Sequence, residues 1–188
     1  LPDSAHLQEE EAMYANRHGT SKHHPAKPLY SLQDAENVLK QLKVFPKNQS
    51  TKITENCFIK PTIAGHVLGA TSINMDIAGK RITFSGDVGR FVAPILPNPE
   101  PLDIGDLLIC ESTYGNRDHS PGSMKDDLAR VILKAIPKRG PIIIPAFALG
   151  RTQDLLYILG ELEREGKIPV FPVYVDSPMA INATAIYR

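Results

Sequence analysis

Residues Ile82-Thr-Phe-Ser-Gly-Asp-Val-Gly-Arg90 predict an apolar strand whose end delivers a carboxylate, Asp87. Gly86 and Gly89 flank this carboxylate, so the backbone is able to turn sharply and to approach another group closely. Asp87 needs a partner, because an unpaired charge beside a core costs free energy. The candidate partner is His66, which lies in Ala64-Gly-His-Val-Leu-Gly69, a second glycine-flanked turn after an expected strand. The sequence therefore predicts two metal-capable side chains at the ends of neighbouring strands.

These two side chains suit a metal-dependent hydrolase. Imidazole and carboxylate are ordinary zinc ligands, and in a two-metal site a carboxylate bridges ions roughly 3.5–4 Å apart, which lower the pKa of a bound water to about 7. Glu111 follows a third expected strand, and functional groups of open α/β sheets gather at the carboxyl ends of strands. A structural interpretation stays open, in which His66 is a hydrogen-bonded turn histidine and Asp87 caps its own turn.

The composition describes a globular chain with no overall charge. Of its 188 residues, 42% are hydrophobic and 22% are charged, and 21 basic residues balance 21 acidic ones. The chain therefore has no overall positive charge that would indicate a nucleic-acid partner, although a local groove is still able to carry positive charge. Cys57 and Cys110 lie in strand-like apolar runs without a CxxC pair, so we expect buried, reduced thiols. No apolar run is long enough to cross a membrane and no signal-peptide pattern is present, so we expect a cytoplasmic protein with no membrane partner.

The first part of the chain predicts two helices followed by strands. A helix is expected over 4–18, and a capping box of Ser31 and Asp34 opens a second helix with Ala35, Val38, Leu39 and Leu42 on one face. Strands are expected over 57–63, over 72–77 with one wet face, over 81–85 after a tight turn at 78–80, and over 106–110, which we expect to be buried on both faces.

The second part alternates helical and apolar segments. Ser123 with Asp126 begins a helix, Gly150-Arg151 opens another that Gly166 closes, and Ser177-Pro178 starts a third. Between them, we expect a buried strand over 141–147 and a further strand over 170–175. This alternation is typical of a parallel α/β sheet.

Five segments of the chain form a recognisable series: Ala64-Gly-His-Val-Leu-Gly-Ala70, Phe84-Ser-Gly-Asp87, Glu111-Ser-Thr-Tyr-Gly115, Ile144-Pro-Ala-Phe-Ala-Leu-Gly-Arg151 and Tyr174-Val-Asp-Ser-Pro-Met-Ala180. Together they resemble the metallo-β-lactamase superfamily, and within it the β-CASP branch of RNA-processing nucleases. The resemblance implies an α/β protein in two parts. Residues 1–114 would form an incomplete metallo-β-lactamase-type αββα sandwich, and residues 115–188 would begin a β-CASP domain with a parallel sheet.

The resemblance also implies roles for individual residues. His66 and Asp87 match metal ligands, with Asp87 bridging two zinc ions. Glu111 matches the acidic residue that opens the β-CASP region and orients a later histidine, and a glutamate there goes with RNA-directed members. The implied activity is a zinc-dependent ribonuclease that uses a metal-bound hydroxide. Arg151, at an expected helix N-terminus, is placed to meet a substrate phosphate, with a surface or capping role as the alternative.

The chain departs from the family pattern at two points. The metal signature His-x-His-x-Asp-His is absent, and so are the two late β-CASP histidines. The remaining histidines do not fit either, and we interpret them as solvated or structural: His6, His18, His23, His24 and His119. We therefore interpret the chain as a fragment that holds part of a two-zinc site and is inactive alone. Two alternatives remain, an inactive scaffold subunit of an RNA-processing complex and a small-molecule hydrolase of the same superfamily. The oligomeric state and the choice between endo- and exonuclease have no sequence pattern that decides them.

Overall fold

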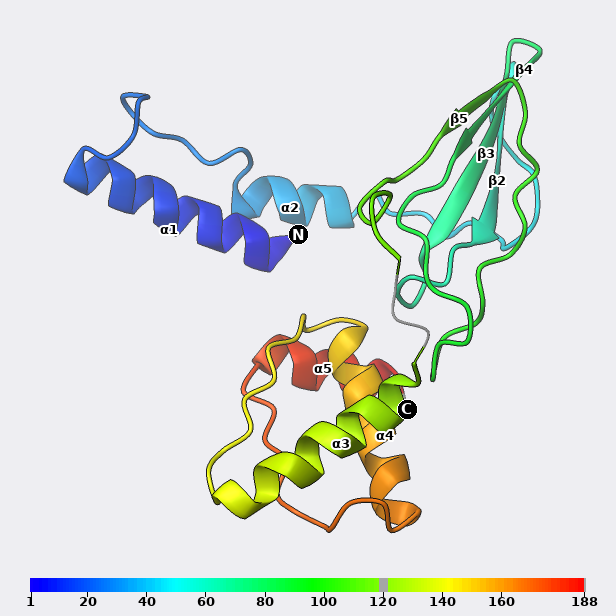
Figure 1. Ribbon diagram of the computed structural model, residues 1–188. Helices are drawn as coiled ribbons and strands as arrows, with labels where there is room; N and C mark the ends of the chain where they lie inside the picture. Colours follow the sequence, from blue (N-terminus) through cyan, green and yellow to red (C-terminus); the bar gives the residue numbers. More distant parts are fainter. Residues whose placement is uncertain (119–121, 188) are drawn as a thin grey trace. The chain divides into compact units, whose positions relative to one another are not determined.

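The computed structural model describes residues 1–118 and 122–187, which form an α/β structure with a mixed sheet (Figure 1). The chain divides into two compact units, Leu1–Phe45 and Pro46–Arg188. His119, which we interpreted as solvated or structural, lies outside the described residues. The elements in chain order are α1 (Pro2–His18), α2 (Leu32–Leu39), β1 (Thr51–Thr54), β2 (Cys57–Ile63), β3 (Thr71–Ile77), β4 (Lys80–Phe84), β5 (Leu107–Ile109), α3 (Met124–Ala135), the short 3₁₀ helix η1 (Ile136–Lys138), α4 (Arg151–Arg164) and α5 (Pro178–Ile186).

The first unit pairs α1 with α2. Its buried side chains are Ala5 and Ala35, and Gln8 accepts a hydrogen bond from the backbone N–H of Leu29 at 3.0 Å. The capping box predicted at Ser31 and Asp34 is confirmed, because both of its reciprocal hydrogen bonds form. The helix ends at Leu39, so Leu42 lies beyond it and is exposed.

The second unit contains a sheet in the order β1-β2-β3-β4-β5, antiparallel except for the parallel pair β4 and β5. The strand predicted over 57–63 is confirmed as β2, and the tight turn between β3 and β4 is confirmed as a two-residue hairpin. Both turn residues have a positive φ, 49° at Ala78 and 74° at Gly79. Such a pair is a type I′ turn, whose twist matches that of the strands it joins.

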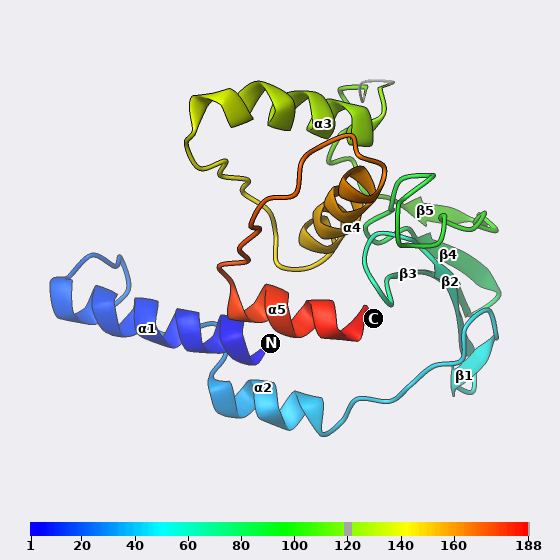
Figure 2. The ribbon, with the colours of Figure 1, turned by 90° about the horizontal axis from the view of Figure 1, so that it is seen from below.

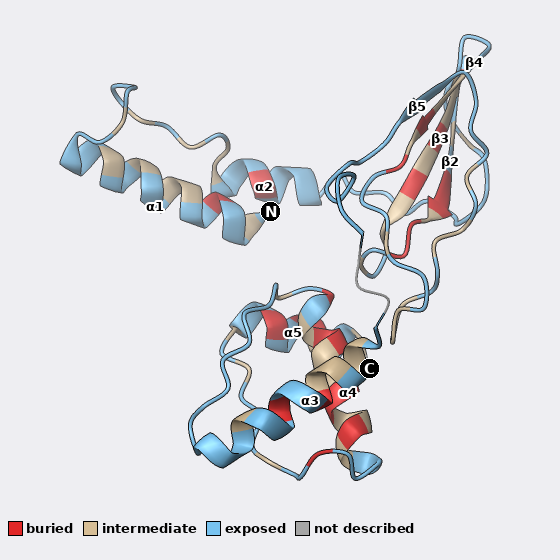
Figure 3. Cartoon of the chain, viewed as in Figure 1, coloured by how far each residue is buried: buried red, intermediate tan, exposed pale blue. Residues whose placement is uncertain are grey.

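The prediction of a wet face on β3 is wrong. Ser72 and Asn74, on the polar side of the alternation, are only 2% and 6% exposed. Figure 3 shows buried (red) positions along β3. The irregular segment after β4 covers them: Asn74 donates to the carbonyl of Asp103 at 3.1 Å, and the hydroxyl of Ser72 donates to the carbonyl of Ser85 at 2.6 Å. These side chains stay buried because their hydrogen bonds compensate for the lost water.

The apolar side chains of the sheet share the other face. The register aligns Ile59 with Met75, Ile82 and Leu107 across four strands. The prediction that the strand over 106–110 is buried on both faces is also wrong, because β5 is an edge strand whose three residues are all exposed. Cys110, which follows β5, is exposed as well, whereas Cys57 is buried, and both are free thiols.

Helices α3 and α4 share a small core. α3 and α4 lie side by side in Figures 1 and 2, and the core residues are Ala129, Ile132, Ile158, Leu159, Leu162 and Ile168. The predicted helix starts are confirmed, since the side chain of Ser123 accepts from Asp126 N–H and that of Ser177 from Ala180 N–H. Within the described residues, no helix is long and apolar enough to cross a membrane.

The two strands predicted in this region, over 141–147 and 170–175, are wrong. Both segments lack strand pairing, and Ile143, Phe147, Val170 and Tyr174 are more than four-fifths exposed. A strand satisfies its backbone groups only through a neighbouring strand. Within residues 122–187 neither segment pairs with one, so the predicted parallel sheet does not form.

Candidate functional site

Three side chains meet where strands of the sheet end. His66 follows β2, Asp87 follows β4 and Glu111 follows β5. The Nε2 atom of His66 lies 3.8 Å from Oδ2 of Asp87, and the two side chains are 47% and 74% exposed. Both groups therefore reach solvent from the same edge of the sheet, as the strand-end pattern predicted.

A tight contact between two backbone turns produces this proximity. The N–H of Gly89 donates to the carbonyl of Ala64 at 2.7 Å. A Cβ atom on Gly89 would overlap the carbonyl group of Gly65 and would lie 2.7 Å from the backbone N of His66. The close approach that we inferred from the flanking glycines is therefore present, and Gly86 also adopts a positive φ of 57°.

Glu111 fixes the turn that carries Asp87. Its Oε1 accepts a hydrogen bond from the N–H of Val88 at 2.7 Å, and its own N–H donates to the hydroxyl of Ser85 at 3.0 Å. The Val88 and Thr113 hydrogen bonds hold the pKa of the Glu111 carboxyl below its usual value against the opposing effect of burial, with His66 adding to the lowering. Glu111 is thus an ionised carboxylate that braces the loop from β4.

The other predicted residues make no hydrogen bond or ion pair with this group in the described structure. Arg151 is exposed at the first position of α4, as predicted, and the described structure gives it no ion pair. The remaining described histidines are exposed: His6 approaches Glu10, His18 bonds the carbonyl of Tyr14, and His23 and His24 lie in the loop after α1. Their exposure agrees with the interpretation of these four as solvated or structural, which stays a prediction.

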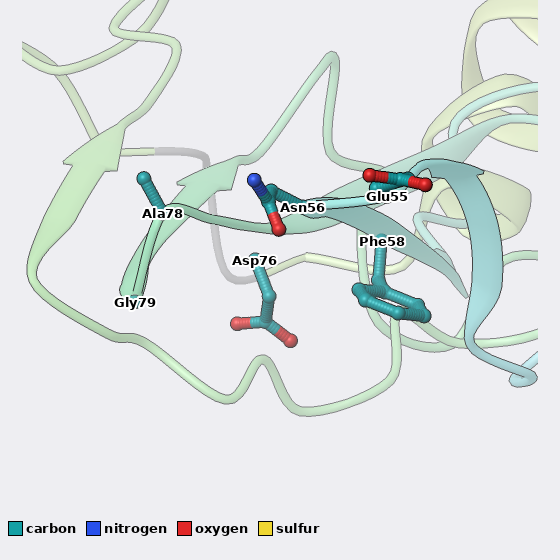
Figure 4. Close-up of a pocket in the computed structure, with 6 residues that line it drawn as sticks. All are labelled: Glu55, Asn56, Phe58, Asp76, Ala78 and Gly79. Carbon is teal, nitrogen blue, oxygen red and sulfur yellow. The ribbon is translucent and has the colours of Figure 1, made fainter.

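A shallow hollow lies at the opposite end of the sheet. It has a volume of about 460 Å³ and is lined by Glu55, Asn56, Phe58, Asp76, Ala78 and Gly79. Phe58 and Asp76 point to the same side of the sheet (Figure 4), as their register requires. Asp76 already pairs with Arg81 at 2.7 Å, and the lining of this hollow contains no histidine or cysteine beside its two carboxylates. The strand ends at His66, Asp87 and Glu111 therefore remain the candidate site.

Comparison with known proteins identifies the family. The Beta-Casp domain family matches residues 152–188. The RNase J-like protein of Methanocaldococcus jannaschii is 36% identical over 162 residues, which cover 84% of this chain and 38% of that protein. Endoribonuclease YSH1 of Gibberella zeae is 34% identical over 90% of this chain and 21% of its own length. The cleavage and polyadenylation specificity factor subunit 3-I of Arabidopsis thaliana is 35% identical over 85% of this chain and 23% of its own length.

The chain belongs to the metallo-β-lactamase β-CASP family. It spans 38% or less of the length of each of these three relatives.

The donor atoms of this β-CASP chain fit a zinc ion in kind but not in number. His66 supplies an imidazole nitrogen and Asp87 a carboxylate oxygen, and both are solvent-accessible donors that zinc accepts. A zinc ion takes four ligands, or three with an open position. Within residues 1–118 and 122–187, no group of three or more His, Cys, Asp and Glu side chains is arranged to hold a metal ion. Two donors are fewer than a zinc ion needs, so the pair by itself is not a complete ligand set.

Sequence reasoning missed the contacts that hold the β-CASP helices against these turns. Nη2 of Arg90 lies 3.6 Å from Oδ2 of Asp154, and the hydroxyl of Tyr187 accepts from the N–H of Leu68 at 3.3 Å. Asp154 is in an amphipathic helix and Arg90 in a loop, so no periodicity relates them. The sequence offered one sign of this ion pair, an acidic residue on the apolar face of the expected helix.

Proposed function

We propose that the protein containing this chain is a zinc-dependent ribonuclease that hydrolyses a phosphodiester bond during RNA processing. Membership of the β-CASP family supports this function, as do relatives named as an endoribonuclease and as a subunit of a cleavage factor. The single observation that carries the proposal is the proximity of His66 and Asp87, 3.8 Å apart, beside Glu111.

In this proposal His66 and Asp87 are zinc ligands. A bound zinc ion lowers the pKa of its water to about 7 and thereby supplies a nucleophile at neutral pH. The two side chains would supply only part of the ligand set that such an ion needs. What the chain itself does is hold the two donors in place, through the Gly65–Gly89 contact and the brace from Glu111.

Substrate contacts belong to the exposed cations near this edge of the sheet. Arg151 begins α4, and the backbone of its N-cap Gly150 lies close to His66, since a Cβ there would be 3.9 Å from the His66 carbonyl oxygen. The positive end of a helix dipole and a guanidinium both favour phosphate. We propose that Arg151 contacts an RNA phosphate. The chain has 21 basic and 21 acidic residues and so no net charge, and local cations such as Arg151 would therefore have to attract the RNA strand.

We further propose the division of the chain between two family domains. Residues 1–114 would form part of a metallo-β-lactamase-type sandwich, and residues 115–188 would begin the β-CASP domain. The Beta-Casp match at 152–188 supports the second assignment. The single apolar face of the sheet supports the first, because one face of each sheet in a sandwich packs against a second layer.

Asp87→Ala tests the proposed function. We expect the whole protein to lose RNA cleavage by 10²-fold or more, on the order of the loss for a group essential to metal catalysis, while its thermal unfolding midpoint stays close to that of the wild type. Glu55→Ala is the matched control, because Glu55 is also an exposed carboxylate but lies at the far end of the sheet. Undiminished cleavage by Asp87→Ala would remove Asp87 from the mechanism. Hydrolysis of a small ester or thioester without any cleavage of RNA would favour a small-molecule hydrolase instead.

A further inference from the structure

The N-terminus of α4 and the end of α5 both touch the turn that carries His66. A Cβ on Gly150, the N-cap of α4, would lie 3.4 Å from Cγ1 of Val67. The N–H of Leu68 donates to the hydroxyl of Tyr187, which follows α5. Two helices of the β-CASP region therefore contact the loop between β2 and β3.

Asp154 adds a charged contact to the neighbouring turn. Its residue is 8% exposed, its Oδ2 lies 3.6 Å from Arg90, and its Oδ1 is buried without a hydrogen-bond partner in the described structure. Burial raises the pKa of the Asp154 carboxyl, and the charges of Arg90 and Arg151 oppose this rise. A buried carboxylate with so little hydrogen bonding depends on its cation, and Arg90 is the cation in contact with it.

Arg90 connects that buried carboxylate to Asp87. It follows Gly89, whose N–H bonds the carbonyl of Ala64 and whose backbone packs against Gly65. A displacement of Arg90 would therefore pull on the contact that holds the Asp87 and His66 turns together. Arg90, which forms the ion pair with Asp154, is the residue directly after Gly89 in the chain.

We propose that Asp154 is a positioning residue, which acts through Arg90 to hold the turn of Asp87, and with it the pair of Asp87 and His66, in place. The importance of this pair rests on the proposed function, but the positioning itself does not require metal or RNA. Asp154 touches no reacting atom in this proposal. It works as a fixed buried anchor for the loop after β4.

Hydrogen exchange of the metal-free chain tests the positioning directly. In Asp154→Asn we expect amides of 86–90, Gly89 above all, to exchange roughly tenfold faster, since exchange reports local opening. The matched control is Glu161→Gln, which removes another carboxylate of α4 from its 3.1 Å ion pair with Lys125. The control should leave exchange at 86–90 unchanged. Unchanged exchange at 86–90 in Asp154→Asn would overturn the proposal.

A second variant separates positioning from a general loss of structure. Arg90 is exposed enough for Arg90→Gln to leave the core intact, with a side chain 43% exposed. If Asp154 acts through Arg90, this variant opens the same amides, and the double variant opens them no further than the larger single effect. Additive effects of the two substitutions, or no effect of Arg90→Gln, would show that Asp154 does not act through Arg90. This holds even if Asp154→Asn loosens the whole of α4.

The whole protein supplies the functional arm of this test. We expect Asp154→Asn to weaken the apparent zinc affinity and to lower kcat more than it raises KM, because it misplaces ligands and not the RNA-binding surface. Unchanged zinc affinity with opened amides would overturn the link between the turn and the ligands. Failure of the proposed function can be told apart from failure of the positioning proposal. If the proposed function is wrong, the wild-type protein cuts no RNA, but the hydrogen-exchange results on the metal-free chain are unaffected.

Discussion

Gly89 is the residue at which the candidate site allows least change. A Cβ there would overlap backbone atoms of Gly65, which have no flexible end to move aside. We expect Gly89→Ala to lower the free energy of unfolding by about 1–3 kcal/mol, the usual cost of forcing extra atoms into a packed region. Urea unfolding of the chain measures this loss.

Gly140→Ala is the control for that substitution. A Cβ on Gly140 meets nothing within 4 Å, so we expect no loss of stability beyond about 0.5 kcal/mol, as for most surface changes. Equal stability of the two variants would mean that the turns carrying His66 and Asp87 are not in contact.

The residues of the candidate site were predictable to different degrees. His66, Asp87 and Glu111 were predicted together because each follows an apolar strand, and strand ends collect at one edge of a sheet. The roles of His66 and Asp87 as ligands stay predictions. Asp154 was not predicted, because the sequence does not say which loop faces a helix. Cys110 was predicted as buried and is exposed, because β5 has a neighbour on one side only.

Among the elements, the hairpin of β3 and β4 is held by an ionic cluster around Arg81. Arg81 pairs with Asp76 on β3 and with Asp103, and its backbone N–H donates to Asp106. The Arg81 hydrogen bonds lower the pKa values of Asp76 and Asp106, and Lys80 adds to the effect on Asp106. Carboxyls with lowered folded-state pKa values stabilise the fold above their unfolded pKa, about 4.

This stabilisation is therefore lost as the pH falls below about 4 and passes through the lowered folded-state values. We expect Arg81→Met to lose less stability than the wild type between about pH 5 and about pH 3, because Asp76 is then no longer held ionised. Urea unfolding midpoints at the two pH values measure the difference. Lys134 is an exposed residue of α3 that makes no ion pair with this cluster in the described structure, so Lys134→Met should retain the wild-type pH dependence. An Arg81→Met protein with the wild-type dependence would contradict the assigned cause.

Sequence patterns predicted the helix caps and turns, which depend on residues close together in the chain. They failed for strands and for burial, which depend on contacts with distant segments. The helix caps at Ser31, Ser123 and Ser177 and the turn at Ala78-Gly79 depend on residues a few positions apart. The strands expected over 141–147 and 170–175 depend on neighbours, and apolar runs of this length do not by themselves fix a strand. The alternation of polar and apolar residues in β3 predicts that its polar face is exposed to solvent, but a distant segment covers that face.

At the scale of the whole molecule, the chain divides between Phe45 and Pro46. Residues 40–50 are exposed throughout, without helix or strand, and exposed irregular segments are preferred sites of proteolysis. We expect brief trypsin treatment to cut after Lys43 or Lys47 and to release the two units, which mass spectrometry identifies. Digestion of the strands over 57–84 before any cut in 40–50 would contradict two separate units.

We propose that this β-CASP chain carries zinc ligands of a ribonuclease, and the zinc dependence of RNA cleavage is the decisive test of this proposal. The whole protein is stripped of metal with a chelator, zinc is returned stepwise, and cleavage of labelled RNA is followed beside a DNA strand of the same sequence. We predict that RNA cleavage disappears on stripping, returns with zinc in the wild type and does not return in His66→Ala or Asp87→Ala. Cleavage that resists the chelator, or that zinc restores equally in both variants, would contradict the account.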